Sequence, residues 1–118
     1  MAKNCTAAER DAERLSSMLG YIHEHYMERL DVETVAQSAA ISTSESLRCF
    51  KRNLNTSPVS YIRDYRIKKA GEMLGNGARS ISETAFACGF EDMSYFSKIF
   101  RSTTGMSPSE YKDTWGRS

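Results

Sequence analysis

The residues most able to do chemistry in this sequence are basic side chains gathered in its middle. Residues 48–69 hold 7 Lys or Arg against 1 Asp or Glu, whereas residues 1–47 hold 4 against 8 and residues 70–118 hold 5 against 6. Cations that share one face attract phosphate even when the whole chain is nearly neutral, as this one is at a formal net charge of +1. The segment therefore predicts either a phosphate-binding face or an ordinary solvated basic helix.

No spacing in the sequence predicts catalysis. His23 and His25 lie two residues apart in a helical segment, so they point in different directions, and no GxSxG motif is present. The closely spaced carboxylates of the same segment are typical of a solvated helix face rather than of an acid/base pair; they are Glu9, Asp11, Glu13 and Glu24. We expect no enzyme, no metal and no cofactor.

The cysteines and the chain start predict a reducing compartment. Cys5, Cys49 and Cys88 are odd in number and contain no CxxC pair, so they indicate neither a disulfide framework nor a zinc module. The residues after Met1 show no apolar core of a secretion signal, and no apolar run approaches the ~18 residues of a membrane span. We expect a cytoplasmic, nucleoid-associated protein without contact to a membrane.

Local signals predict an all-α domain of about seven helices. Apolar residues at helical spacing and end signals place the longer helices at about 6–29, 43–53 and 58–74, with shorter ones between and after them. Capping boxes are expected at Thr6/Glu9, Ser42/Glu45 and Ser80/Glu83, single caps at Asp31, Ser57, Asp92 and Ser107, and a left-handed helix end at Asn55.

The chain also repeats itself. Phe50 matches Phe100, Ser57-Pro58 matches Ser107-Pro108 and Tyr61 matches Tyr111 at an offset of 50 residues, and Ile41 matches Phe90 at 49. Each copy is predicted to form a helix, a tight turn and a second helix. In such a unit the second helix projects from the surface and can enter a DNA major groove. Two such helices can read successive grooves if they lie ~34 Å apart, one turn of the duplex. A connecting helix of about 17 residues spans ~25 Å, which is compatible with that spacing.

The stretch SISETAFACGFEDMSYFSKIFRSTTGMSPSEY at 80–111, together with SESLRCFKRNLNTSPVSYIRDYRIKKAGEML at 44–74, resembles the DNA-binding domain of AraC/XylS-family transcription regulators. The resemblance covers about residues 15–113. It implies a homeodomain-like, all-α domain at 6–114, with helix-turn-helix units at 31–54 and 80–104, a connecting helix at 58–74, and flexible ends at 1–5 and 115–118.

Two groups of contact residues follow from this resemblance. Base edges would be read by the exposed faces of the two second helices, with Arg48 able to pair with guanine and Leu47 with a thymine methyl; the set is Ser44, Leu47, Arg48, Met93, Ser94, Ser97 and Lys98. Phosphates would be held by side chains near the helix ends and on the connecting helix; these are Lys51, Arg52, Arg63, Arg66, Lys69 and Arg101.

Two positions break the repeat. Ala40 stands where the second unit has Gly89, and a Cβ on a left-handed residue there costs roughly 1 kcal/mol. Ser46 stands opposite Phe96 with Leu47 beside it, which leaves open which of the two faces the core. Leu47 and Met93, like other apolar residues beside core positions, have core packing as the alternative to base contact.

The expected partner is double-stranded DNA with a bipartite operator, bound by a monomer because both reading helices lie in one chain. RNA polymerase is a further candidate partner, and the resemblance implies that an additional domain could supply oligomerisation. The alternative function is a helical protein–protein interaction module whose basic face binds an acidic partner.

Overall fold

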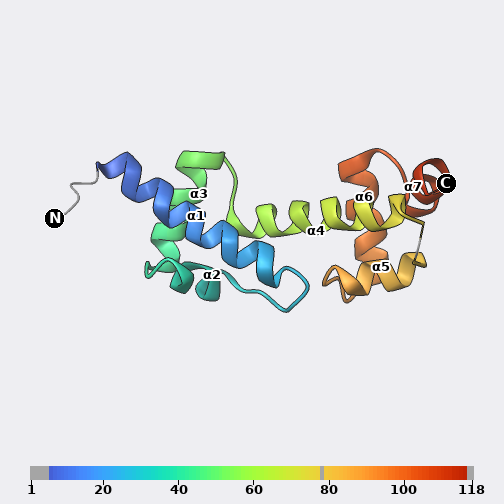
Figure 1. Cartoon of the computed structure of the whole chain (residues 1–118), viewed down its shortest axis with the longest axis horizontal. Helices are drawn as coiled ribbons and strands as arrows, with labels where there is room; N and C mark the ends of the chain where they lie inside the picture. The colour runs from blue at the N-terminus through green and yellow to red at the C-terminus, as the bar shows by residue number, and fades with distance from the viewer. Residues whose placement is uncertain (1–5, 78, 117–118) are drawn as a thin grey trace. The chain divides into compact units, whose positions relative to one another are not determined.

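The computed structural model describes residues 6–77 and 79–116, and these residues form seven α-helices and no strand (Figure 1). The helices are α1 (Ala7–His25), α2 (Val32–Ser38), α3 (Thr43–Leu54), α4 (Pro58–Gly75), α5 (Ile81–Ala87), α6 (Met93–Thr104) and α7 (Pro108–Trp115). The all-α prediction is confirmed. α1 ends at His25 rather than near Arg29, and Trp115, which was expected in a flexible end, closes α7. The other expected ends, 1–5 and 117–118, lie outside the described residues.

Side-chain caps begin the helices where the sequence places them. Thr6 Oγ1 accepts from the Glu9 N–H (3.1 Å), and Asp31 accepts from the Thr34 N–H (2.8 Å). Asp92 caps α6, and reciprocal capping boxes begin α5 and α7 at Ser80 and Ser107. These bonds satisfy amide groups that the first helical turn leaves without a partner.

The expected capping box at Ser42 is only half formed. Ser42 Oγ accepts from the Glu45 N–H (3.1 Å), but the Glu45 carboxylate binds arginine side chains. A carboxylate at the third position of a helix can cap the backbone or form ion pairs, and the nearby guanidinium groups offer it the stronger, charge-assisted bonds. The helix begins at Thr43 as expected, with its cap supplied by one side chain instead of two.

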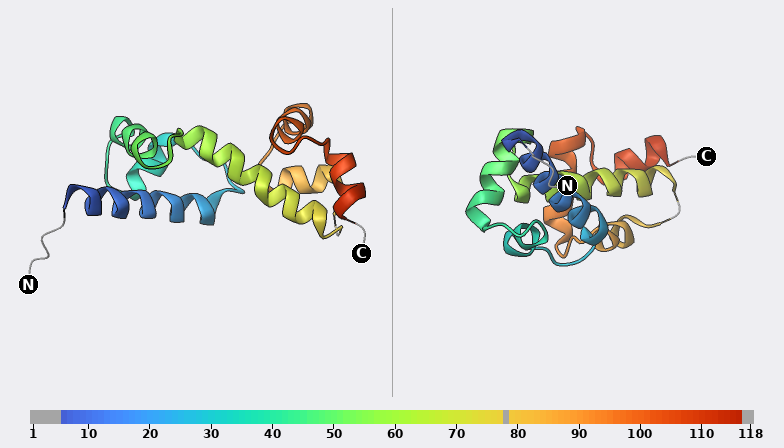
Figure 2. Two further views of the ribbon diagram at one scale, coloured as in Figure 1. Left: turned by 90° about the horizontal axis from the view of Figure 1, so that it is seen from above. Right: turned by 60° about the vertical axis from the view of Figure 1, so that its left-hand side comes forward.

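The chain divides into two compact units. Unit 1 holds residues up to His25 together with Leu30–Ile62, and unit 2 holds Tyr26–Arg29 with the residues from Arg63 onward, so α4 contributes to both. In unit 1, α1 packs against α2 and α3, which follow each other through a tight turn (Figure 2). Its interior is formed by side chains from all four of its helices; the buried ones include Met18, Ile22, Val35, Ala36, Cys49, Phe50 and Ile62.

Unit 2 is built around aromatic rings. Phe90, Phe96 and Phe100 are buried with residues of α4 and α5, and consecutive ring centroids lie 5.0 and 5.6 Å apart. Phe100 also meets Tyr111 edge to face at 5.1 Å. In unit 1 the matching residues Phe50 and Tyr61 form the same contact at 5.8 Å, so the repeat seen in the sequence is also a repeat of packing.

The two turns close with the same geometry. The Ile41 N–H donates to the Ala36 carbonyl (3.2 Å), and the Phe90 N–H donates to the Ala85 carbonyl (3.0 Å). Such a bond needs a left-handed residue before the donor. Gly89 has φ +91° and Ala40 has φ +56°. Ala40 therefore takes the left-handed conformation that its position in the repeat predicts, although it carries a Cβ. Asn55 is left-handed as well, at φ +53°.

Candidate nucleic-acid interface

The first candidate reading surface is the outer face of α3. Ser44 and Arg48 are exposed, and Leu47 keeps 43% of its surface exposed. Ser46 is fully buried, and its hydroxyl donates to the Thr43 carbonyl (2.6 Å). Ser46 therefore faces the core and Leu47 faces outward, which answers the question of register that the sequence left open. A buried serine is tolerated here because a carbonyl oxygen of its own helix accepts the hydrogen bond from its hydroxyl.

The second candidate reading surface is the outer face of α6. Ser94 and Lys98 are exposed and Ser97 is half-buried, whereas Phe96 and Phe100 point into the core. Met93 is partly buried and packs against the hydrophobic core of unit 2, so part of its side chain serves packing. Tyr95 is 48% exposed on this helix. It is not among the contact residues expected from the sequence, and it matches Glu45 in the repeat.

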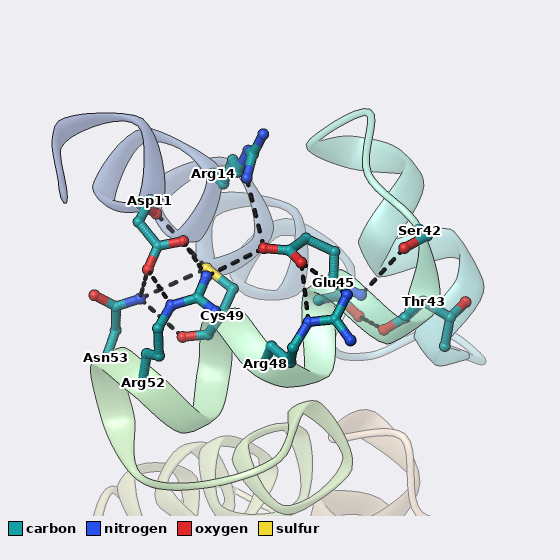
Figure 3. A network of polar contacts seen from close by, with 10 residues as sticks. Asp11, Arg14, Ser42, Thr43, Glu45, Arg48, Cys49, Arg52 and Asn53 are labelled. Carbon is teal, nitrogen blue, oxygen red and sulfur yellow. Dashed lines mark hydrogen bonds and ion pairs between the residues drawn. The ribbon is translucent and has the colours of Figure 1, made fainter. Parts of the chain in front are cut away.

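A polar network ties α1 to α3 (Figure 3). Arg52 donates from Nε to Asp11 Oδ2 (3.0 Å) and from Nη2 to Asp11 Oδ1 (2.6 Å), a bidentate pair. Asn53 Nδ2 donates to the same Oδ2 (2.7 Å), and the Cys49 thiol lies 3.6 Å from the Asp11 carbonyl oxygen. Four of the bonds between the two helices thus meet at one aspartate.

Asp11 is therefore not the solvated helix-face residue that the sequence indicated. Its side chain is only 13% exposed. Hydrogen bonds from Arg52 and then Asn53 hold the pKa of Asp11 well below its usual range, and the same contact raises the pKa of Arg52. The spacing of carboxylates along α1 carries no signal for this role, because the partners lie about 40 residues away in the sequence.

Glu45 is the second carboxylate of the network. Its Oε2 accepts from Arg48 Nε (3.1 Å) and pairs with Arg48 Nη2 (3.0 Å), while its Oε1 lies 3.2 Å from Arg52 Nη2 and 3.6 Å from Arg14 Nη1. The bonds from Arg48, followed by those from Arg52, lower the pKa of Glu45. A hollow of about 510 Å³ adjoins the network between α1 and α3, lined by Arg10, Arg14 and Arg52 among others.

The residues expected to hold phosphate differ in how free they are. The side chains of Lys51 and Arg101 are exposed and form no hydrogen bond or ion pair with residues 6–77 or 79–116. Arg52 is committed to Asp11 and Glu45, and Arg63 pairs with its neighbour Asp64 at 3.2 Å. Lys69 pairs with Glu72 at 3.4 Å and lies over the Tyr65 ring at 5.5 Å. The pairs of Arg63 and Lys69 lie at the surface, where ion pairs are weak and exchange readily for a phosphate.

Arg66 occupies a different environment. Its Nε donates to the Tyr26 carbonyl (2.8 Å) and its Nη2 to the Glu28 carbonyl (2.7 Å), both in the segment that follows α1. The side chain is half-buried, and burial lowers its pKa. The structure does not favour the phosphate contact expected for Arg66, because its donors already satisfy backbone oxygens of its own unit.

The two histidines that the sequence raised as candidate reactive groups each contact a tyrosine. Residues 6–77 and 79–116 contain no group of three His, Cys, Asp or Glu side chains placed to hold a metal ion. His23 Nε2 lies 2.8 Å from the Tyr61 hydroxyl, and the ring of His25 packs on Tyr21. None of the described helices combines the length and the apolar character that a membrane span requires.

Comparison with known proteins shows that the chain is similar to helix-turn-helix proteins. A family model described as a helix-turn-helix domain matches residues 35–114, more than half of the chain. A Bacillus subtilis protein named as an uncharacterised helix-turn-helix-type transcriptional regulator, YdeC, is 38% identical over 99 residues, which cover 84% of this chain and 34% of that protein. The chain thus spans about a third of the length of the curated relatives it matches.

Solved structures show the same fold. The DNA-binding domain of the transcription factor AdpA, solved in complex with a target DNA, has a TM-score of 0.81 at 28% identity, covering 86% of this chain and 92% of that one. A transcriptional regulator with an AraC-type DNA-binding domain from Chromobacterium violaceum has a TM-score of 0.84 at 24% identity, covering 90% and 95%. The latter likeness is one of fold.

Proposed function

The chain belongs to the AraC/XylS-type helix-turn-helix family, and on that premise we propose that it binds double-stranded DNA sequence-specifically as the DNA-binding part of a bacterial transcription regulator. The proposal includes a bipartite site in which α3 and α6 each read one major groove of two successive turns. It includes binding as a monomer, because one chain carries both helices. Contact with RNA polymerase, oligomerisation through another domain and a cytoplasmic, nucleoid-associated location stay predictions.

One observation carries the proposal: the second helix of both repeats turns a polar, basic face outward at equivalent positions. Arg48 of α3 and Lys98 of α6 match at the offset of 50 residues, and both are exposed. A helical module that bound an acidic protein through a general basic face would not need two matched second helices behind two matched turns.

Roles can be proposed for the individual side chains from their placement. Ser44, Leu47 and Arg48 would read one box and Ser94, Ser97 and Lys98 the other, with Met93 contributing only the part of its side chain that the core leaves free. Lys51 and Arg101 would hold phosphates, joined by Arg63 and Lys69 once their weak surface pairs open. For Arg52 and Arg66 we propose structural roles within units 1 and 2.

The first test is selection of bound duplexes from a randomised pool at about 100 mM salt, followed by footprinting of the enriched site. We expect two short boxes about one helical turn apart, protected along one face of the DNA. Binding should weaken by roughly 10³- to 10⁵-fold between 50 and 200 mM salt if 6 to 10 phosphates are contacted. No enriched sequence would overturn the proposal and favour the interaction module.

The second test is Arg48→Ala on the selected site. A bidentate pair with guanine contributes about 1–3 kcal/mol of discrimination, so the variant should lose preference at one base pair of one box while the other box keeps its pattern. Lys51→Ala is the matched control, since loss of a phosphate contact weakens all sequences about equally. An unchanged base preference in Arg48→Ala would refute the role assigned to Arg48.

A further inference from the structure

We propose that Glu45 is a specificity-determining residue that acts through Arg48: its carboxylate opposes the charge of that guanidinium and fixes its orientation, so that Arg48 reads a base edge and is drawn less strongly to phosphates. This inference rests on the proposed DNA binding. It concerns a positioning role, because Glu45 itself need not touch DNA.

The geometry of the pair leaves part of Arg48 available. Glu45 Oε2 is bonded by Nε at 3.1 Å and lies 3.0 Å from Nη2. An arginine side chain has five N–H donors in a planar fork. The bonds to Glu45 use the Nε side, so both N–H groups of Nη1 and the second N–H of Nη2 remain for the acceptors of a guanine edge. The Arg48 side chain is 62% exposed, so that end can be reached from outside.

Charge explains why such a pair distinguishes bases from phosphates. Glu45 places a negative charge 3.0 Å from Arg48 Nη2, so a phosphate approaching Arg48 meets attraction from the guanidinium and repulsion from the carboxylate. A base edge carries no net charge, so its hydrogen bonds to the guanidinium suffer no such repulsion. Glu45 is itself held in place, because Arg52 and Arg14 lie 3.2 and 3.6 Å from its other oxygen.

The second repeat lacks this device. The residues that match Glu45 and Arg48 there are Tyr95 and Lys98, and Lys98 forms no ion pair with the described residues. The same position in the fold therefore carries an arginine paired with a carboxylate in α3, and in α6 a lysine that has no ion pair with the described residues. We therefore assign this positioning of a base-reading side chain to the first reading helix, α3.

The experiment is a double-mutant cycle on Glu45→Gln and Arg48→Ala, measured on the selected duplex and on an unrelated duplex over a series of salt concentrations. In the Glu45→Gln variant the released arginine should gain one phosphate contact on unrelated DNA. One phosphate contact steepens the slope of log affinity against log salt concentration by about 0.9. If the variant and the original chain bind unrelated DNA equally at about 1 M salt, the variant should therefore bind it about 8-fold more tightly at about 0.1 M. Affinity for the selected duplex should change by less than about 2-fold, because the gained and the lost contact offset each other.

The cycle separates this role from a structural one. In the Arg48→Ala background, Glu45→Gln should leave the salt slope on unrelated DNA unchanged. The control Glu33→Gln removes one exposed carboxylate from α2 of the same unit and should steepen the slope far less than Glu45→Gln does. If Glu45→Gln does not fold, Glu45→Asp, which shortens the side chain, is measured instead and should shift the slope in the same direction by a smaller amount.

Three results would overturn the inference: an unchanged slope in Glu45→Gln, the same change in the Arg48→Ala background, or an equal change in Glu33→Gln. Each leaves the proposed function intact as long as the unaltered chain still selects a duplex. If the unaltered chain selects no duplex at all, the proposed function fails and this inference falls with it.

Discussion

Replacing Ala40 with glycine should stabilise unit 1, and replacing Gly89 with alanine should destabilise unit 2 by a larger amount. The two residues occupy the same place in the repeat, each just before the amide that closes the turn, at φ +56° and +91°. The pair therefore tests in both directions whether the turns demand a left-handed residue.

The size of the first effect follows from two opposing terms. A left-handed conformation costs an L-residue about 1–2 kcal/mol, which the glycine variant recovers. Glycine is more flexible in the unfolded chain, and this returns about 0.5–1 kcal/mol. We expect a net gain of about 0.5–1 kcal/mol, which raises the melting temperature by about 2–8 °C in a domain of this size.

The second effect adds a steric term. A Cβ built on Gly89 would lie 2.7 Å from the carbonyl oxygen of Tyr26 and 3.1 Å from Nε of Arg66. The first contact involves backbone, so the segment after α1 must move for the side chain to fit. The loss should therefore exceed the conformational cost of about 1–2 kcal/mol alone.

Thermal unfolding followed by circular dichroism, with hydrogen exchange to assign each change to its unit, measures both effects. Gly20→Ala is the control: nothing lies within 4 Å of a Cβ at this α1 position, and alanine is favoured over glycine in a helix by about 1 kcal/mol. An Ala40→Gly variant that melts at or below the original temperature would refute the strain argument, as would a harmless Gly89→Ala.

Three further perturbations test the network and the core. Arg66→Ala should lower the unfolding free energy by about 1–3 kcal/mol because two carbonyls lose their charged donor, while the salt slope of DNA binding stays the same; a shallower slope would return Arg66 to the phosphate contacts. Asp11→Asn should cost about 1–2 kcal/mol at pH 7. Because the pKa of Asp11 is depressed in the folded state, its contribution is present above the ordinary value of 3.8 and is lost as the pH falls below it. The difference between Asp11→Asn and the original chain should therefore shrink in unfolding titrations below about pH 4, and a pH-independent difference would contradict the ion pair. Burial raises the pKa of Cys88 to about 11 and also raises that of Cys49, so both thiols should resist alkylation at pH 8 until the chain unfolds, as peptide mass spectrometry can follow; rapid labelling of either would show that its unit opens readily.

The elements were predictable because their signals are local. A cap at Asp31 or Ser80 acts within three residues, and the left-handed residues at Asn55 and Gly89 end helices that the sequence pattern had already outlined. The repeat strengthened each assignment, since a weak signal in one copy could be compared with a clearer one in the other. Ala40 illustrates this: by itself it gives no sign of positive φ, but its match to Gly89 does.

The candidate site was less predictable because its contacts are not local. Nothing near Asp11 in the sequence distinguishes it from Glu13, yet only the tertiary fold brings Arg52 and Asn53 to it. The phosphate contact predicted for Arg66 met the same limit: its position on the helix is local information, whereas the two carbonyls that it bonds lie about 40 residues away in the sequence. Charge counts along a chain locate cations but do not tell which of them are already neutralised.

The differences between the repeats show that one fold is stabilised in two ways. Unit 2 fills its centre with Phe96 and closes its turn with glycine, so its own helix pair supplies packing and turn geometry. Unit 1 has Ser46 and Ala40 at those places, which removes apolar volume and adds strain. Its compensation comes from α1, whose Met18 and Ile22 are fully buried and whose Asp11 bonds α3. The position of the first reading helix thus depends on a helix outside its own helix-turn-helix pair, and a change at α1 would be felt at Arg48 through Glu45.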